Sequence, residues 1–141
     1  MTVAASAGYS GKPLWQKLGL KDGTRLYVAD APAAWPRLLA EAPRGVTSLP
    51  RLVQFDIAIL FVTSRAALAA TLARTLPKLG VGGMIWVAWP KQASGVVTDV
   101  TEDTVRAVAM PMGIVDVKVC AIDATWSGLK LVRRRAPVAA P

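Results

Sequence analysis

The strongest constraint on the fold is a run of six apolar residues, Ile57 to Val62, inside the sequence FDIAILFVTS at residues 55–64. An unbroken apolar run is typical of a strand buried on both faces, as in a parallel sheet. The sequence GMIWVAW at residues 83–89 has the same character. Parallel strands need crossover connections, so the pattern also predicts helices covering the sheet.

The rest of the chain alternates strand and helix patterns. We expect further strands at residues 24–32, 46–50, 114–123 and 129–134, and helices at 10–19, 33–45, 65–76 and 101–110. We expect Thr63 or Ser64 to cap the third helix and Thr101 to cap the fourth. Turns are expected at GVGG (80–83) and ATWSG (124–128).

These patterns predict an α/β fold. We expect a single three-layer Rossmann-like domain, with a mostly parallel sheet closed by a C-terminal antiparallel hairpin. The domain would span residues 1–135, with an N-terminal arm and short helix at 1–23, and residues 136–141 would form a flexible tail.

Histidine is absent, and Cys120 is the single cysteine. This composition argues against the usual zinc sites and against Ser-His or Cys-His nucleophile pairs. One cysteine excludes an internal disulfide and fits the reducing cytoplasm. The start of the sequence does not resemble a signal peptide, and no apolar run reaches the ~20 residues of a membrane span. We therefore expect a cytoplasmic protein that does not enter a membrane.

The net charge of +8 is concentrated at the ends of the chain. Residues 1–25 carry +3 and residues 130–141 carry +4, which leaves +1 for everything between them. Basic ends attract polyanions loosely, but solvated terminal residues are the better explanation of this charge. Nucleic-acid binding through the termini therefore ranks last among the functions considered. The mean hydropathy of +0.40 is high for this size and suggests that a second copy covers apolar surface.

Two segments resemble Rossmann-like methyltransferases. The sequence LARTLPKLGVGGMIWVAW is similar to the late helix, glycine turn and strand of these enzymes, and VKVCAID followed by GLKLVRR is similar to the antiparallel hairpin that closes their sheet. The resemblance covers roughly the last two-thirds of the chain and speaks to fold rather than activity.

The chain departs from these enzymes after its first strand. In the methyltransferases a glycine-rich turn follows that strand and lets the backbone approach S-adenosylmethionine. Here the sequence is VADAPAAWP: Pro32 and Pro36 carry no N–H, Trp35 is bulky, and Asp30 is the one polar side chain at the strand end. The usual cradle for the cofactor is absent, and so is the G-x-G-x-x-G pattern of dinucleotide sites.

A second resemblance covers nearly the whole chain. The strings GYSGKPLWQKLGL, ILFVTSR, WVAWPKQASGVVTDVTED and KVCAIDATWSGLKLVRRR look like a family of small bacterial proteins known as a domain of unknown function. The resemblance implies a stand-alone bacterial cytosolic protein and supplies no catalytic residue. No cofactor can be named from the sequence.

Ten polar or aromatic residues are expected at or near the carboxyl ends of the strands, where open α/β sheets bind ligands. The ligand-binding candidates are Asp30, Thr63, Ser64, Trp89, Lys91, Ser94, Thr98, Asp99, Asp123 and Trp126. No catalytic or metal-binding residue is predicted. Four of the ten are more often helix caps or turn residues: Asp30, Thr63, Ser64 and Asp99. The tryptophans are more often core or interface anchors, and Lys91 is the best anion contact.

Two hypotheses follow. The first is a non-catalytic α/β binding module, as a homodimer, that holds a small anionic ligand or a protein partner through the 89–99 loop and the 123–127 turn. The alternative is a methyltransferase-like enzyme with a rebuilt S-adenosylmethionine site, in which Asp30 and Thr63 face the ligand. Trp35 or Leu38 filling the space above the first strand would count against the alternative.

Overall fold

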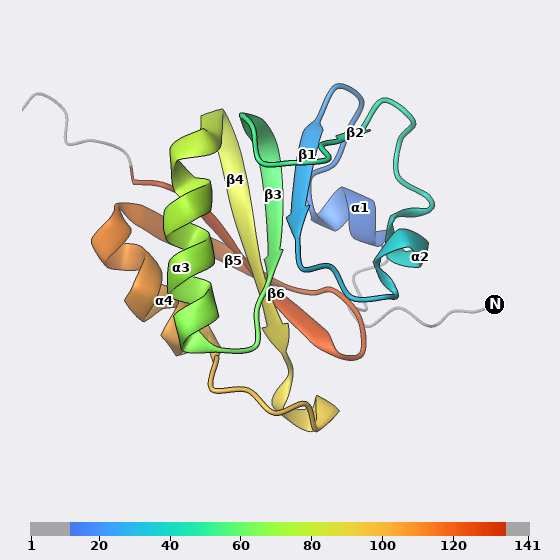
Figure 1. Ribbon diagram of the computed structural model, residues 1–141. Coiled ribbons are helices and arrows are strands. Elements are labelled where there is room, and N and C mark those ends of the chain that lie inside the picture. Colours follow the sequence, from blue (N-terminus) through green and yellow to red (C-terminus); the bar gives the residue numbers. More distant parts are fainter. Residues whose placement is uncertain (1–11, 135–141) are drawn as a thin grey trace, which may run out of the picture.

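The computed structural model describes residues 12–134, which form a six-stranded sheet with helices on both faces (Figure 1). The strands are β1 (Arg25–Ala29), β2 (Thr47–Ser48), β3 (Phe55–Phe61), β4 (Leu79–Pro90), β5 (Ile114–Ala121) and β6 (Trp126–Arg133). The α-helices are α1 (Leu14–Lys17), α2 (Trp35–Leu39), α3 (Arg65–Thr75) and α4 (Glu102–Ala109). Short 3-10 turns are η2 (Leu76–Lys78), η3 (Gln92–Ser94) and η4 (Met110–Met112). The expected start of the first helix, residues 1–11 of the N-terminal arm and the tail at 136–141 lie outside the described residues.

The sheet has the strand order β2-β1-β3-β4-β6-β5 and is mixed. Parallel pairing joins β1 to β2 and β3, and β3 to β4, whereas β6 pairs antiparallel with both β4 and β5. The α/β Rossmann-like prediction is confirmed in this form. The predicted closure is corrected, because the β5–β6 hairpin extends the sheet past β4 and leaves β5 as an open edge strand.

The apolar run of β3 is unbroken because the strand is buried on both faces of the sheet. Ala58 and Leu60 belong to the core under α3 and α4, whereas Ile57 and Ile59 belong to the core on the opposite face, with α1 and α2. All four side chains have 3% or less of their surface exposed. A central strand between two helical layers needs apolar residues at every position.

Two helix starts agree with the sequence. The Ser64 hydroxyl accepts from Ala67 N at 3.0 Å at the start of α3. At α4, the Thr101 hydroxyl accepts from Thr104 N at 3.2 Å and the Thr104 hydroxyl accepts from Thr101 N at 3.1 Å, which completes a capping box. Among the described residues, no helix has the length and apolar character needed to cross a bilayer.

The expected turn at GVGG is wrong, since residues 80–83 lie within β4. The β3–β4 register shifts between Phe55 and Ile57, where β4 contains extra residues. A Cβ on Gly83 would lie 2.5 Å from the Asp56 carbonyl oxygen, and one on Gly80 would lie 2.9 Å from the Phe55 carbonyl oxygen. These glycines allow close approach of two strands at a bulge, a use that sequence alone does not separate from a turn.

Other boundaries differ as well, and the strand expected at 24–32 ends at Ala29. Helix α2 ends at Leu39, and Ala42 N then donates to Leu39 O in a tighter turn, so the predicted helix at 33–45 is too long. The final turn is earlier than 124–128, because Trp126 already pairs with Pro90 in the sheet. In β5, a register shift between Asp116 and Lys118 interrupts the predicted alternation.

Candidate functional site

The carboxyl ends of β1, β3, β4 and β5 lie at one edge of the sheet, because these strands run in the same direction. The strand order reverses between β1 and β3: the chain passes from β1 to β2 on one side and from β3 to β4 on the other. Open α/β sheets bind ligands outside the carboxyl ends at such a reversal. The ten candidate residues lie along this carboxyl edge.

An aromatic cluster of Trp35, Phe61 and Trp126 lies at the carboxyl end of β3, next to the reversal point. Trp35 begins α2, is only 6% exposed, and meets Phe61 at the end of β3 edge-on, with ring centroids 5.6 Å apart. Trp126 meets Phe61 edge-on at 5.0 Å. The cluster is part of the core beneath α1 and α2. These rings therefore occupy space beside the carboxyl ends of β1 and β3, where an open sheet would hold its ligand.

Asp30 lies beside this cluster with a backbone φ of 56°, in the left-handed region. Aspartate adopts this conformation more readily than most side chains, so Asp30 makes the sharp exit from β1. Its exposed carboxylate has no hydrogen-bond or ion-pair partner within residues 12–134. Asp30 therefore has a backbone role and also remains available to a ligand.

Two of the candidates, Thr98 and Asp99, hold the loop after β4 against the start of α3. Asp99 accepts from Arg65 N at 2.7 Å through Oδ1. The Thr98 hydroxyl donates to Thr63 O at 2.7 Å and accepts from Val100 N at 3.0 Å. Ser64 caps α3, as described above. For Ser64 and Asp99 these contacts are the structural alternatives that the sequence left open.

Two more candidates make turns. The Ser94 hydroxyl donates to Lys91 O at 2.7 Å and accepts from Val96 N at 3.2 Å. Asp123 accepts from Thr125 N and Trp126 N, each at 2.8 Å, through Oδ1. Lys91 N in turn donates to Thr125 O at 2.7 Å, so the 89–99 loop and the 123–127 turn are joined.

Of the other candidates, Trp89 and Lys91 line a pocket of about 350 Å³ where the chain leaves β4, here called the β4-exit pocket, and the exposed Thr63 is not among its lining residues. Its lining residues are Trp89, Pro90, Lys91, Gln92, Thr98, Val100, Thr101, Glu102 and Ser127. Trp89 is only 7% exposed, and its indole N–H has no acceptor among the described residues. The Lys91 ammonium likewise has no carboxylate partner within the described part of the chain. The pocket thus offers an unpaired cation and an unpaired donor.

The sequence did not single out Gln92, Thr101 or Ser127 as pocket residues. Ser127 comes from β6 and reaches the pocket because β6 pairs with β4, placing Ser127 opposite Trp89. Glu102 brings a carboxylate to the pocket, but Arg106 binds it, and Arg106 also contacts Asp116 through Nε at 2.9 Å. These pocket residues could not be identified from the sequence, because they depend on strand order, which no local pattern encodes.

Cys120 is buried on the face of the sheet that α1 covers. Burial raises the pKa of its thiol, and the nearby ammonium groups of Lys17, Lys118 and Lys91 act in the opposite direction. A buried thiol with a raised pKa is a poor nucleophile. Within residues 12–134 no group of three or more carboxylate or thiol side chains could hold a metal ion.

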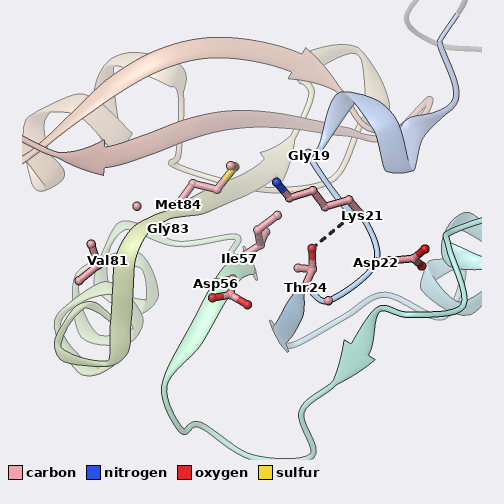
Figure 2. A pocket seen from close by; sticks show the side chains of 11 residues that line it. Gly19, Lys21, Asp22, Thr24, Asp56, Ile57, Val81, Gly83 and Met84 are labelled. Carbon is pink, nitrogen blue, oxygen red and sulfur yellow. Dashed lines mark hydrogen bonds between the residues drawn. The ribbon is translucent and has the colours of Figure 1, made fainter.

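A second opening, here called the amino-edge cavity, lies at the amino ends of β1, β3 and β4 and measures about 420 Å³ (Figure 2). It is on the opposite edge of the sheet from the ten candidates. No pattern in the sequence singled it out, although glycines cluster on two of the three segments that line it, at Gly19 and Gly23 and at Gly82 and Gly83.

S-adenosylmethionine, which the methyltransferase resemblance implies, does not fit the residues at the strand-order reversal. Trp35 and Phe61 take the space beside the end of β1, and the segment between β1 and α2 has prolines in place of a glycine turn. Seating the cofactor there would require the aromatic cluster to open.

The sequence matches no protein-family model and no curated protein. Solved structures do match. A Streptococcus agalactiae protein of the NADB-Rossmann superfamily has 11% identity and a TM-score of 0.57, over 95% of this chain and 73% of that one. The B. subtilis tRNA methyltransferase TrmK has 9% identity and a TM-score of 0.58, over 94% and 68%.

A third match is Aeropyrum pernix fibrillarin with natively bound S-adenosyl-L-methionine. It has 15% identity and a TM-score of 0.52, over 84% of this chain and 73% of that one. At such low identities the likeness concerns the fold alone. The chain has the Rossmann-like fold of methyltransferases, so the fold expectation drawn from the first resemblance is confirmed.

Proposed function

We propose that this chain is a methyltransferase-fold protein that acts as a binding module and holds a small anionic ligand in the β4-exit pocket. The observation that carries the proposal is the aromatic cluster, which lies at the usual ligand position, while the β4-exit pocket at the same edge of the sheet stays open. The cluster also supports the non-catalytic part of the proposal.

The charges around the β4-exit pocket favour an anion. Lys91 supplies an unpaired ammonium, while the carboxylate of Glu102 is already bound by Arg106. The hydroxyl of Ser127 and the indole of Trp89 add donors around the same opening, whereas the Thr101 hydroxyl is already engaged in the capping box. A cation ringed by neutral donors in a partly buried site suits a small carboxylate or phosphate.

The test is a thermal melt with inorganic phosphate, pyrophosphate or acetate at fixed ionic strength. An anion at about 100 times its dissociation constant adds about 2.7 kcal/mol to the free energy of unfolding, and a rise of several degrees follows. Lys91→Gln should lose most of that rise. Lys78→Gln, an exposed lysine in η2 at the opposite edge, is the matched control and should keep it. An equal rise in both variants would contradict the site.

The second candidate is an S-adenosylmethionine-dependent enzyme with a rebuilt site. The fold comparisons, taken by themselves, support this alternative better than the binding module. Asp30, exposed and unpaired beside β1, is the side chain that would face the cofactor. No reaction step follows from these residues, because the cluster fills the site.

A thermal melt with S-adenosylhomocysteine separates the two candidates. The binding module predicts no rise in the melting temperature at millimolar concentrations. A saturable rise that is lost in Asp30→Ala would mean that the aromatic cluster opens, and the enzyme would then become the leading proposal.

The proposal keeps the setting expected from the sequence, a bacterial cytoplasm and a second copy of the chain. Val96 and Val97 are exposed on the 89–99 loop and support a protein partner there as the other form of the binding module. Nucleic-acid binding still ranks last. It predicts DNA binding that weakens steeply with salt and is lost without residues 130–141.

A further inference from the structure

The amino-edge cavity has an apolar floor and a polar rim. Its lining residues are Gly19, Lys21, Asp22, Gly23, Thr24, Asp56, Ile57, Val81, Gly82, Gly83 and Met84. Figure 2 shows Lys21 extending across the opening, over Ile57 and toward Met84. A volume of about 420 Å³ lies in the range of small-molecule sites.

Glycines keep the cavity open. Gly82 has a φ of 74°, and a Cβ there would meet no atom within 4 Å, so no side chain fills the space over the bulge in β4. Gly19 has a φ of 88°, and a Cβ there would lie 3.3 Å from the methyl group of Met84. The backbone at both positions suits glycine, and the Met84 side chain lies in the room that Gly19 leaves.

Lys21 is the one charged group of the lining without a partner within residues 12–134. Arg25 engages both oxygens of Asp56: its Nη2 donates to Oδ1 at 3.0 Å and its backbone N to Oδ2 at 2.8 Å. Asp22 accepts from Gly45 N at 2.9 Å and points away from the cavity in Figure 2. The unsatisfied charge at the opening is therefore positive.

Thr24 adds a buried donor. Its side chain is 4% exposed, and its hydroxyl accepts from Lys21 N at 3.1 Å. The hydroxyl proton has no acceptor among the described residues. An incoming acceptor could therefore receive a hydrogen bond from Thr24 and an ion pair from Lys21.

We propose that the amino-edge cavity binds a small monocarboxylate with an apolar tail. The carboxylate would pair with Lys21 and Thr24, and the tail would lie against Ile57 and Met84. A doubly charged phosphate suits the site less well, because one unpaired cation faces it and the carboxylates of Asp22 and Asp56 are close by. This site is independent of the β4-exit pocket.

The test uses hexanoate and the full chain labelled in its methionine methyl groups, observed by NMR. The sequence has four methionines, and Met84→Leu identifies the Met84 signal. Hexanoate should shift Met84 saturably and leave Met110, which lies in η4 and is exposed, unchanged. Lys21→Gln should weaken hexanoate binding at least tenfold, whereas Lys78→Gln should not change it.

Hexylamine, which has the same tail and the opposite charge, should give no saturable shift. Three outcomes would each overturn the proposal: no Met84 shift with hexanoate, equal affinity in Lys21→Gln, or equal affinity for hexylamine. The folding of each variant is checked from its methyl spectrum before titration.

Discussion

Asp56 lies on the polar rim of the amino-edge cavity, but its carboxylate has a structural role. It follows the first residue of β3, and Arg25 in β1 reaches it with its backbone N and its guanidinium. The side-chain hydrogen bond from Arg25 is the main reason why the pKa of Asp56 lies below its ordinary value of 3.8, and burial opposes the shift. The pair joins two neighbouring strands at their amino ends.

This pKa shift predicts a pH-dependent stability. A carboxylate whose pKa is lower in the folded state stabilises the protein above its unfolded pKa, and the contribution is lost as the pH falls through the folded pKa. Asp56→Asn should therefore lower the urea midpoint at pH 7, and the difference from the parent should shrink once the pH falls below 3.8. Because both side chains are more than a third exposed, we expect a modest effect.

Asp30→Asn is the matched control, since Asp30 is exposed and unpaired and asparagine tolerates its positive φ. Its urea midpoint should stay near that of the parent at both pH values. A pH-independent loss in Asp56→Asn would assign the effect to backbone hydrogen bonding rather than to charge.

At the scale of elements, the start of α4 joins the candidate site to the core. The capping box of Thr101 and Thr104 satisfies the first turn, and Val105, in the next turn, is fully buried. The preceding residues Thr98 and Asp99 bind the chain at Thr63 and Arg65. The end of the 89–99 loop is therefore bonded to the start of α3 and leads directly into the capped start of α4.

Thr101→Ala should lower the free energy of unfolding by about 0.5–2 kcal/mol, because Thr104 N loses its acceptor at the start of α4. Urea unfolding followed by circular dichroism measures the change. Thr63→Ala is the matched control, since the Thr63 hydroxyl is exposed and makes no hydrogen bond among the described residues. Equal losses in the two variants would show that the cap contributes nothing specific.

The glycines of β4 show where secondary structure could not be predicted correctly from the sequence alone. Gly80 to Gly83 has the composition of a turn, and the run continues as strand because β3 and β4 approach closely there. The helix caps at Ser64 and Thr101 were predicted correctly because a cap bonds within four residues of itself. A bulge depends on the partner strand, which lies 25 or so residues away in the chain.

At the scale of the whole molecule, the open edge of the sheet leaves apolar surface uncovered. Val117 and Val119 on β5 are 52% and 48% exposed, and β5 has no strand on its outer side. An exposed apolar edge strand is a common place for chain association. This observation supports the proposed second copy.

Sedimentation equilibrium should find a mass of twice 14.9 kDa at micromolar concentration, with association strengthened by salt because each chain carries +8. Val119→Lys should shift the protein toward a single chain. Val97→Lys, on the exposed 89–99 loop, adds the same charge away from β5 and should leave the mass unchanged. A single-chain mass for the parent protein would contradict the second copy.

The sequence by itself determined the α/β class, the buried central strands and the caps at Ser64 and Thr101. Each of these depends on the period of apolar residues or on hydrogen bonds within one turn, and both are local properties. It also placed the ten candidates at or near strand ends and gave cap or turn roles as the alternative for Ser64 and Asp99, but it did not reveal that Ser94 and Asp123 are engaged in turns.

Only the tertiary structure decided what fills the two edges of the sheet. The aromatic cluster joins Trp35, Phe61 and Trp126, and the amino-edge cavity joins residues 19–24, 56–57 and 81–84. These groups meet because β1 lies beside β3 and because β6 pairs with β4. Strand order and register follow from the packing of the whole core, so no local window of the sequence contains them.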